Sequence, residues 1–248
     1  PKDWDITTNA TPEQIQELFH KTIYENKFGT VGVINEDVSD ETLKIIEITP
    51  FRLESKYSDK RHPDEVRFTS NLEDDLKRRD FTINALALNV VEGMAGEIID
   101  LFGGQNDLKN KIIRAVGNPE ERFEEDALRM LRAIRFSAEL GWKISHETQE
   151  AIKKKAHLLE MIAQERIKDE FEKIIMSDNA SQGVRAMNEL GILKYVIPEL
   201  EEGIGVEQNK DHKFTVWEHN LRALDHAVSK KWPFFVRLAA LLHDVGKP

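Results

Sequence analysis

The sequence predicts an α+β protein in which a small sheet domain precedes a helical one. Runs of β-branched residues at 28–35 and 43–49 favour strands in the first part of the chain. From Gly104 onward, apolar residues instead recur at helical spacing almost throughout. A chain of 248 residues is long enough for two or three domains, and we place the first boundary after Gly103.

The composition is that of a charge-rich protein without cysteine. Hydrophobic residues make up 40% of the chain and charged residues 32%, and no apolar run approaches the roughly 20 residues of a membrane span. The absence of cysteine excludes disulfides and thiolate metal sites, and it fits a reducing cytoplasm. The net charge of −10, taken alone, argues against nucleic-acid binding, but it leaves room for a local basic groove.

In the first domain, strands and short helices are expected to alternate. Thr11 begins a helix, because Pro12 follows it and Gln14 occupies the capping-box position. The two β-branched runs are expected to pair as a hairpin, and the polar stretch 54–71 to form a loop. The remaining elements are a strand end at 3–6, a helix at 72–77 and a strand, turn and strand over 89–101.

The second half of the chain predicts helices. The strongest signal is one continuous helix from Glu121 to Leu140. A short extended piece is expected at 112–116. Further helices are predicted at 107–110, 146–157, 163–176, 180–190 and 217–229, and another begins at 234.

Carboxylates are concentrated on one face of the predicted sheet. Asp3 and Asp5 stand two residues apart and share a face, while Trp4 and Ile6 point toward a core. Such a pair suits two divalent ions roughly 3.5–4 Å apart, although a polar strand end at the surface has the same pattern. Glu47 lies between two isoleucines and shares the open face if those isoleucines are buried.

The stretch Arg78-Arg79-Asp80-Phe81-Thr82-Ile83-Asn84 leads into an apolar stripe and predicts the start of a helix, with Asp80 or Thr82 as the N-cap. A helix N-terminus beside two guanidiniums is suited to a polyphosphate. A capped helix with a solvated basic turn is equally consistent with this stretch alone.

Within the strong helix, Asp126, Arg129, Arg132 and Arg135 recur at helical spacing. The simple interpretation is an ion pair three residues apart on a surface helix. The functional one is base selection. An aspartate accepts from the exocyclic amine of cytosine or adenine, and an arginine donates to the ring nitrogen beside it. Guanine and uracil present the opposite order, so such a pair rejects them.

Taken together, these motifs resemble the class II tRNA nucleotidyltransferase and poly(A) polymerase family, in the form of the bacterial CCA-adding enzymes. The resemblance covers about residues 1–200. It rests on these segments in one order: DWDITT, IEITPFR, RRDFTINALA, DLFGGQNDL, GNPEERFEEDALRMLRAIRF and ERI.

The resemblance implies a polymerase-β-like nucleotidyltransferase head at 1–103, followed by a helical neck and body at 104–205 that select the base and bind tRNA. Asp3 and Asp5 would bind a pair of Mg²⁺ ions that activate the tRNA 3′-hydroxyl, with Glu47 as a third carboxylate near them. The reaction would add C or A from CTP and ATP and release pyrophosphate. A non-catalytic RNA-binding protein is disfavoured, because clustered carboxylates repel phosphate without metal.

The remaining motif residues take roles by the same resemblance. Ribose and triphosphate would be held by Arg78, Arg79, Asp80 and Asn84, the incoming base read by Asp126 and Arg129, and the nucleotide, at its phosphates, contacted by Arg132 and Arg135. Glu165 and Arg166 match a helix-bracing motif. The family's Gly-rich turn and V-R-D segment would lie upstream of Pro1. Residues 24–29 differ from the usual CCA-adding form, so CCA, CC-only, A-only and poly(A) products stay open.

A separate signal lies near the end of the chain. His219 and the run His243-Asp244-Val245-Gly246-Lys247 resemble the start of an HD domain, which we place at 206–248. Two imidazoles and a carboxylate suit a divalent transition metal or Mg²⁺. The full HD pattern needs a further aspartate downstream. The alternatives are therefore a phosphohydrolase and a helix pair kept for packing or tRNA contact.

The acidic net charge and an RNA substrate are reconciled by a predicted basic strip on the helical body. Two lysine runs, 153–155 and 230–231, are the candidates for it.

Overall fold

The computed structural model describes residues 4–25, 29–55, 65–91, 94–208 and 213–248. The chain divides into two compact units: residues 1–58 with 63–79, and residues 59–62 with 80–248. The division falls between Arg79 and Asp80. Boundaries near 103 and 205 stay predictions. No helix among the described residues is long and apolar enough to span a membrane.

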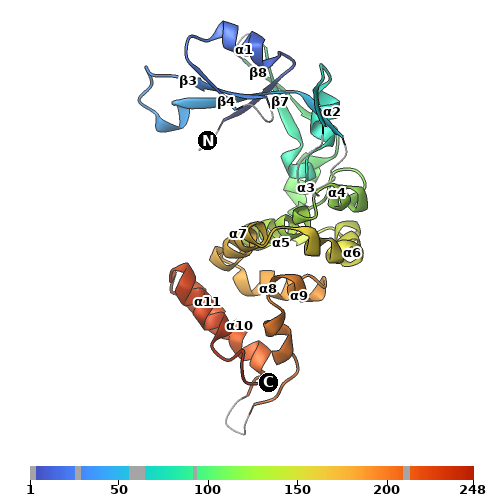
Figure 1. Cartoon of the computed structure of the whole chain (residues 1–248), viewed down its shortest axis with the longest axis vertical. Coiled ribbons are helices and arrows are strands. Elements are labelled where there is room, and N and C mark those ends of the chain that lie inside the picture. The colour runs from blue at the N-terminus through green and yellow to red at the C-terminus, as the bar shows by residue number, and fades with distance from the viewer. Residues whose placement is uncertain (1–3, 26–28, 56–64, 92–93, 209–212) are drawn as a thin grey trace. The chain divides into compact units, whose positions relative to one another are not determined.

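The first unit is built on a four-stranded sheet of order β1-β4-β3-β2 (Figure 1). Its strands are β1 (Asp5–Thr8), β2 (Thr22–Glu25), β3 (Thr30–Ile34) and β4 (Ile45–Pro50). β1 pairs with β4 in parallel and the other pairs are antiparallel, so the sheet is mixed. The predicted hairpin of the two β-branched runs is confirmed.

Helix α1 (Pro12–Leu18) covers one face of this sheet. Thr11 and Gln14 form the predicted reciprocal capping box. Ile15 packs with Val31, Val33 and Ile48 in a small core. Ile6 lies in the same row as Ile48 on β1, an edge strand. The expectation that Trp4 and Ile6 point into a core was wrong, because both side chains remain 44% exposed.

The expectation of a loop over 54–71 was partly wrong. β5 (Arg52–Ser55) and β6 (Glu65–Phe68) pair as an antiparallel ribbon, with residues 56–64 outside the described part. Helix α2 (Leu72–Lys77) follows and matches the predicted bounds. A short 3-10 helix, η1 (Glu41–Leu43), precedes β4.

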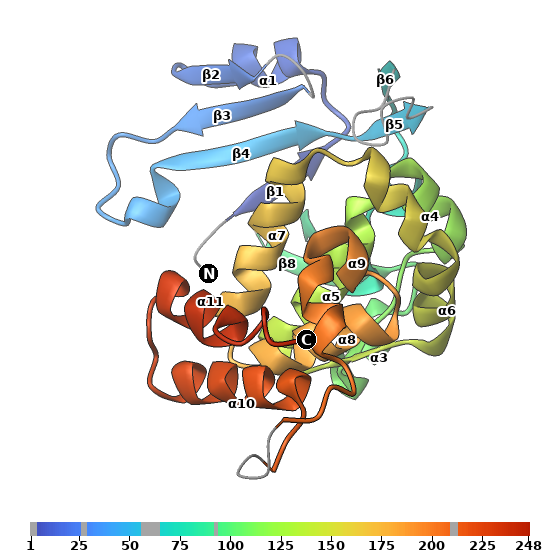
Figure 2. The same cartoon turned by 60° about the horizontal axis from the view of Figure 1, so that its bottom comes forward.

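The second unit begins with a hairpin and continues as a helical bundle (Figure 2). Its first elements are η2 (Thr82–Asn84), β7 (Leu86–Val91), β8 (Met94–Asp100), α3 (Gly104–Asn110) and β9 (Ile112–Ile113). The bundle follows as α4 (Pro119–Glu125), α5 (Leu128–Leu140), β10 (Lys143–Ile144), α6 (His146–Lys155), η3 (Ala156–Met161), α7 (Gln164–Met176), α8 (Ala180–Glu189), α9 (Leu193–Val196), η4 (Pro198–Gly203), α10 (Val216–Ser229) and α11 (Phe234–Leu242).

Two predicted helices were wrong in an informative way. The expected helix after Thr82 is one 3-10 turn without a side-chain cap, and the chain then enters β7, which pairs with β8. The long helix over 121–140 is two helices, because Asp126 adopts an extended backbone with φ −137° and ψ 105° between α4 and α5. Without a helix after Thr82, no helix N-terminus supports polyphosphate binding at this motif.

One large core holds the second unit together. It joins α5, α7 and α8 through side chains such as Leu131, Ile134, Ile174 and Val184, all fully buried. Helix α5 also packs against β9 and β10. The remaining bundle helices matched their predictions to within a few residues, whereas β10, η3, α9 and η4 were not predicted.

Candidate active site

The open face of the sheet carries the candidate catalytic carboxylates. Asp5 pairs in register with Glu47, and Glu47 pairs with Gly32 on its other side. The isoleucine that follows Glu47 is buried against α1, so Glu47 and Asp5 share the opposite face, where both are exposed. The predicted grouping of these two carboxylates is therefore seen, while Asp3 lies outside the described residues.

This face suits a divalent cation. Two exposed carboxylates on adjacent strands offer the oxygen ligands that Mg²⁺ prefers, and Gly32 adds no side chain beside them. A row of threonines that the sequence reasoning missed lies next to them. Thr7 pairs in register with Thr49 and donates to its carbonyl over 3.1 Å, and the Thr30 and Thr49 hydroxyls lie 3.1 Å apart. The alternation that placed Glu47 predicts these positions too.

Arg78 and Arg79 are held by a buried aspartate that the sequence reasoning also missed. Asp75 on α2 is 0% exposed and accepts from Arg78 at 2.7 Å and from Arg79 at 3.4 Å. It also accepts from the backbone N–H of Arg52 at 3.4 Å, which ties α2 to β5. Asp75 precedes Arg78 by three residues and Arg79 by four, a spacing that indicates ion pairs on a helix. Paired in this way, the guanidiniums are fixed in position at the end of α2.

In the second unit, Asp80, Asn84 and Arg132 come together. The Asp80 carboxylate accepts from Asn84 at 3.2 Å and from the backbone N–H of Phe81 at 2.8 Å. Its other oxygen accepts two bonds from the Arg132 guanidinium, at 2.9 and 2.6 Å. Arg132 stays one-third exposed. A two-bond pair of this kind orients the guanidinium while leaving part of it open to a ligand.

The two candidate base-reading residues lie where α4 ends and α5 begins. Asp126 accepts from the backbone N–H of Leu128 at 3.0 Å and from Arg166 on α7 at 3.0 Å. Arg129, on the first turn of α5, donates to Glu125 at 2.6 Å and to the carbonyl of Arg122 at 3.2 Å. Arg166 therefore contacts Asp126 itself, and Glu125 holds Arg129. At the break in the helix, the Asp126 carboxylate accepts from the first turn of α5.

Arg135 lies deeper than a phosphate-binding residue would suggest. Its side chain is 12% exposed and its Nε lies 2.8 Å from Glu170, which is itself buried. Its guanidinium also lies 4.3 Å from the centroid of the Phe136 ring. Phe136 in turn meets Phe81 edge to face at 5.6 Å. Through its contacts with Glu170 and Phe136, Arg135 links α5 to α7 and to the segment after Asp80.

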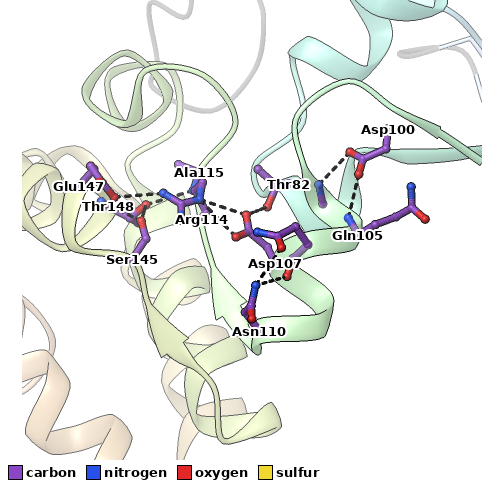
Figure 3. A network of polar contacts seen from close by, with 12 residues as sticks. Thr82, Asp100, Gln105, Asp107, Asn110, Arg114, Ala115, Ser145, Glu147 and Thr148 are labelled. Atoms are coloured by element: carbon purple, nitrogen blue, oxygen red, sulfur yellow. Dashed lines mark hydrogen bonds and ion pairs between the residues drawn. The ribbon is translucent and has the colours of Figure 1, made fainter.

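A polar network surrounds η2 and α3 (Figure 3). The buried Asp107 accepts from Thr82 at 2.7 Å and from Arg114 at 3.1 Å, and Arg114 also pairs with Glu147 at 3.1 Å (Figure 3). A Cβ added at Gly104 would lie 2.2 Å from the carbonyl oxygen of Thr82, so only glycine allows this approach. These contacts fix the segment that carries Asp80 and Asn84 against α3 and β9.

Asp100 holds the first turn of α3, next to this network. Its two carboxylate oxygens accept from the backbone N–H groups of Gly104 at 2.8 Å and Gln105 at 2.9 Å, at the first turn of α3 (Figure 3). Burial alone would raise the pKa of Asp100, but the hydrogen bonds from Gln105, Gly104 and neighbouring backbone groups lower that pKa below its ordinary value.

A second cluster joins the three residues of the HD-like motif. His219 on α10 and His243, just after α11, place their Nε2 atoms 3.0 Å apart, and an Asp244 oxygen lies 3.5 and 3.6 Å from them. His243 Nδ1 lies 2.9 Å from the carbonyl of Ala240, which leaves Nε2 for a ligand. The potential ligand atoms all lie within 4.8 Å of one another.

Lys247 also contacts this cluster, with its ammonium 2.6 Å from Asp244. Burial alone would raise the pKa of Asp244, but the hydrogen bond from Lys247 and the nearby charges of His243 and Lys247 lower that pKa. The sequence-predicted residues of this cluster are thus brought together, with an amine competing for the carboxylate.

The first of the two lysine runs is paired with glutamates. Lys153 pairs with Glu150 at 2.8 Å, and Lys154 pairs with Glu120 on α4 at 2.7 Å. Lys155 pairs with Glu120 and Glu124 of the same helix. This run is therefore neutralised locally and joins α6 to α4.

The sheet, its open carboxylate face and the helical unit define a fold of the nucleotidyltransferase class. Models of two protein families match: a poly A polymerase head domain over residues 1–114, and a probable RNA and SrmB-binding site of polymerase A over residues 141–204. The chain belongs to the tRNA nucleotidyltransferase and poly(A) polymerase family, as the motifs predicted. Membership implies general use of a divalent metal.

Relatives support this assignment. The chain is 50% identical over 194 residues to a CCA-adding enzyme of Ligilactobacillus salivarius, covering 78% of this chain and 46% of that protein. It is 42% identical over 245 residues to one of Leuconostoc citreum, covering 98% and 56%. The chain thus spans about half the length of these curated relatives.

Solved structures agree. The CCA-adding enzyme of Bacillus stearothermophilus in complex with CTP superposes with a TM-score of 0.71 at 34% identity, covering 98% of this chain and 61% of that one. A tRNA nucleotidyltransferase complexed with a primer tRNA and an incoming ATP analog has a TM-score of 0.67 at 27% identity, covering 97% and 67%.

The hydrogen bonds to Asp100 predict a pH-dependent stability. The folded-state pKa of Asp100 lies below its ordinary value of 3.8, so its stabilisation is present above that pH and is lost as pH falls through the folded-state pKa. We expect Asp100→Asn to lower the unfolding free energy by about 1 kcal/mol at neutral pH, because hydrogen bonds to a charged acceptor are weakened. Urea unfolding of both proteins at several pH values measures this difference. The difference should shrink on acidification, whereas a pH-independent loss would contradict a role for the charge of the Asp100 carboxylate.

Proposed function

We propose that the protein of which this chain is part adds C and A residues from CTP and ATP to the 3′ end of tRNA, without a nucleic-acid template. The observation that carries the proposal is the register pairing of Asp5 with Glu47 on the open face of the sheet. A nucleotidyltransferase of this family needs metal-binding carboxylates, and this pair supports that role. We assign the proposed reaction to the cytoplasm.

The carboxylates fit the metals that the reaction needs. We assign Asp3 and Asp5 as ligands of two Mg²⁺ ions, with Glu47 beside them as a third carboxylate. When bound, such ions make the tRNA 3′-hydroxyl a better nucleophile and neutralise the triphosphate. The Asp5 and Glu47 carboxylates lie on the same side of the sheet because their strands are adjacent and in register, so both are available to the ions from that side. The 3′-oxygen forms a bond to the α-phosphorus while the bond to pyrophosphate breaks.

The cationic residues of the family motif serve binding. Arg78 and Arg79 are assigned to the triphosphate, and their contacts with buried Asp75 hold them in place. Asp80 and Asn84 are assigned to the ribose, and Arg132 and Arg135 to positions near the phosphates. Arg132 fits this role well because it is oriented by Asp80 and partly exposed. Arg135 fits it less directly, because Glu170 already holds it.

Base selection is assigned to Asp126 and Arg129. The carboxylate accepts from the amine of cytosine or adenine, and the guanidinium donates to the adjacent ring nitrogen. Arg166 and Glu125 restrain these two side chains, which favours a single arrangement of donor and acceptor. Alternative products within the family are a single A, CC only, or a poly(A) tail.

The carboxylate assignment predicts a catalytic loss without unfolding. We expect Asp5→Asn, made in the full-length protein, to lower incorporation of CMP into tRNA lacking CCA by about a thousandfold or more, because a metal ligand is removed. Single-turnover extension assays with labelled CTP measure the rate. Asp37→Asn, at an exposed turn position of the same unit, is the matched control and should leave the rate unchanged. Normal extension by the Asp5 variant would refute the assignment.

The base-selection assignment predicts relaxed specificity. Asp126→Asn replaces an acceptor by an amide that also donates to a carbonyl of uracil or guanine. We expect the preference for CTP over UTP, measured as a ratio of kcat/KM, to fall about 10- to 100-fold. Arg166→Gln removes the residue that holds Asp126 but leaves the base-reading carboxylate itself. It should therefore lower the rate of incorporation while keeping the preference for CTP over UTP. An unchanged preference in the Asp126 variant would remove this residue from the reading role.

The histidine cluster supports a second candidate, an HD-type phosphohydrolase activity that the segment 206–248 would begin. Two imidazoles and a carboxylate within 4.8 Å form a donor set suited to a divalent transition metal or Mg²⁺. The family assignment and the sheet carboxylates favour nucleotide transfer as the main activity, with this site as an additional one.

This candidate predicts metal binding that does not depend on Asp5. We expect the full-length protein to bind Mn²⁺ or Co²⁺ at a site that His219→Ala together with His243→Ala abolishes, because both imidazole ligands are lost. Equilibrium dialysis with metal analysis counts the ions, and hydrolysis of a phosphomonoester is followed in parallel. His226→Ala on the same helix is the control. Equal metal content in the double variant would make the cluster a packing feature only.

A further inference from the structure

The outer side of α10 and the turn after it carry a group of exposed basic residues. Arg222, His226 and Lys230 recur every four residues and so share one side of the helix, and Lys231 comes next in the chain. All four side chains are exposed. Among the described residues, no carboxylate forms an ion pair with Arg222, Lys230 or Lys231, whereas Arg185 nearby pairs with Glu218 at 2.6 Å. We name these four residues the α10 strip.

Aromatic side chains accompany these cations. The Arg222 guanidinium lies 3.9 Å from the centroid of Phe214, which is 39% exposed. Trp232 meets His226 edge to face at 5.6 Å and is 41% exposed. Phe235, at the start of α11, is 80% exposed. Cations interleaved with exposed rings suit a partner that presents both phosphates and flat bases.

The turn holds these groups in one conformation. The backbone N–H of Lys231 donates to Val228 at 2.8 Å and that of Trp232 to Ala227 at 3.1 Å, which is a Schellman C-cap. Arg237 donates to the carbonyl of Trp232 at 2.9 Å and to that of Ser177 at 3.0 Å. Lys231 occupies the left-handed position of the cap, with φ 54°. Glycine is usual there, so a lysine is kept at a conformational cost.

The other lysine run of the helical unit differs from this one. Residues 153–155 are each paired with a glutamate of α4 or α6. An incoming phosphate would have to displace those carboxylates, whereas the α10 strip requires no such exchange. Asp225 is an exposed acidic neighbour on α10. Its single negative charge is outweighed by the positive charges of Arg222, Lys230 and Lys231, so the strip keeps a net positive charge.

We propose that the α10 strip is an RNA-contact surface that binds the phosphate backbone of the tRNA substrate away from its 3′ end. Arg222, Lys230 and Lys231 contact phosphates, and Trp232 and Phe235 pack on exposed bases or riboses. This inference rests on the proposed tRNA substrate and adds to it a specific binding surface. It also explains how a protein of net charge −10 retains RNA affinity.

The test measures binding of tRNA lacking CCA to the full-length protein by fluorescence anisotropy over a range of salt concentrations. The triple variant Arg222→Gln, Lys230→Gln and Lys231→Gln is expected to raise Kd about tenfold or more at low salt and to lower the salt slope by about 2 to 3. Trp232→Ala is expected to raise Kd with little change in slope, because stacking releases no counterions.

Two controls make the result specific. The triple variant of Lys153, Lys154 and Lys155 to Gln changes the net charge equally, and its Kd should stay within about twofold of wild type because those lysines are already paired. Lys231→Gly removes one charge while fitting the left-handed backbone better. It should weaken binding while keeping or raising Tm, which separates lost contact from lost folding.

The outcomes are distinguishable. If wild-type protein neither binds nor extends tRNA, the proposed function fails. If wild type extends tRNA but the α10-strip triple variant matches the 153–155 variant in Kd and salt slope, the function stands and this surface assignment is overturned. Binding of wild type to anionic vesicles that the α10-strip variant loses, with tRNA affinity unchanged, would also overturn it and assign the surface to lipid.

Discussion

The pairing of β1 with β4 is the constraint on which the candidate active site depends. Side chains alternate along a strand, so a shift of register by one residue would move Glu47 to the face covered by α1. The parallel register instead sets Asp5 beside Glu47 and Ile6 beside Ile48. Burial of Ile48 against Ile15 and Val31 thus specifies the position of the carboxylates. A hydrophobic contact on one face of the sheet determines where charge is presented on the other.

A second regularity is that each arginine of the family motif is held by a carboxylate. Asp75 holds Arg78 and Arg79, and Asp80 holds Arg132. Likewise Glu125 holds Arg129, and Glu170 holds Arg135. Long side chains lose rotamer entropy when they bind a ligand, and ion pairs formed beforehand reduce that loss. Partly buried pairs also keep a guanidinium oriented better than exposed pairs do.

The sequence predicted the fold class, the sheet hairpin and most helices because these depend on periodicity and capping residues. The helix expected after Thr82 was wrong because Leu86 to Val91 pairs with β8, and this long-range pairing outweighs a local helical pattern. The break at Asp126 was missed for a similar reason. Its side chain bonds to Leu128 and to Arg166, forty residues along the chain. No spacing within the helix predicts that partner.

Ion pairs, like secondary structure, can be predicted from the sequence when the partners are close in the chain but not when they are distant. Partners three or four residues apart, such as Asp75 and Arg78, are visible in the sequence once helices are assigned. Partners on different helices, such as Lys154 and Glu120, are not. Net charge therefore says little about where an anion can bind. What matters is which cations remain unpaired after the helices pack, and the packing of α6 on α4 neutralises one lysine run while the turn after α10 leaves the other exposed. In an acidic protein, a cluster of exposed cations without carboxylate partners marks a surface open to a polyanion.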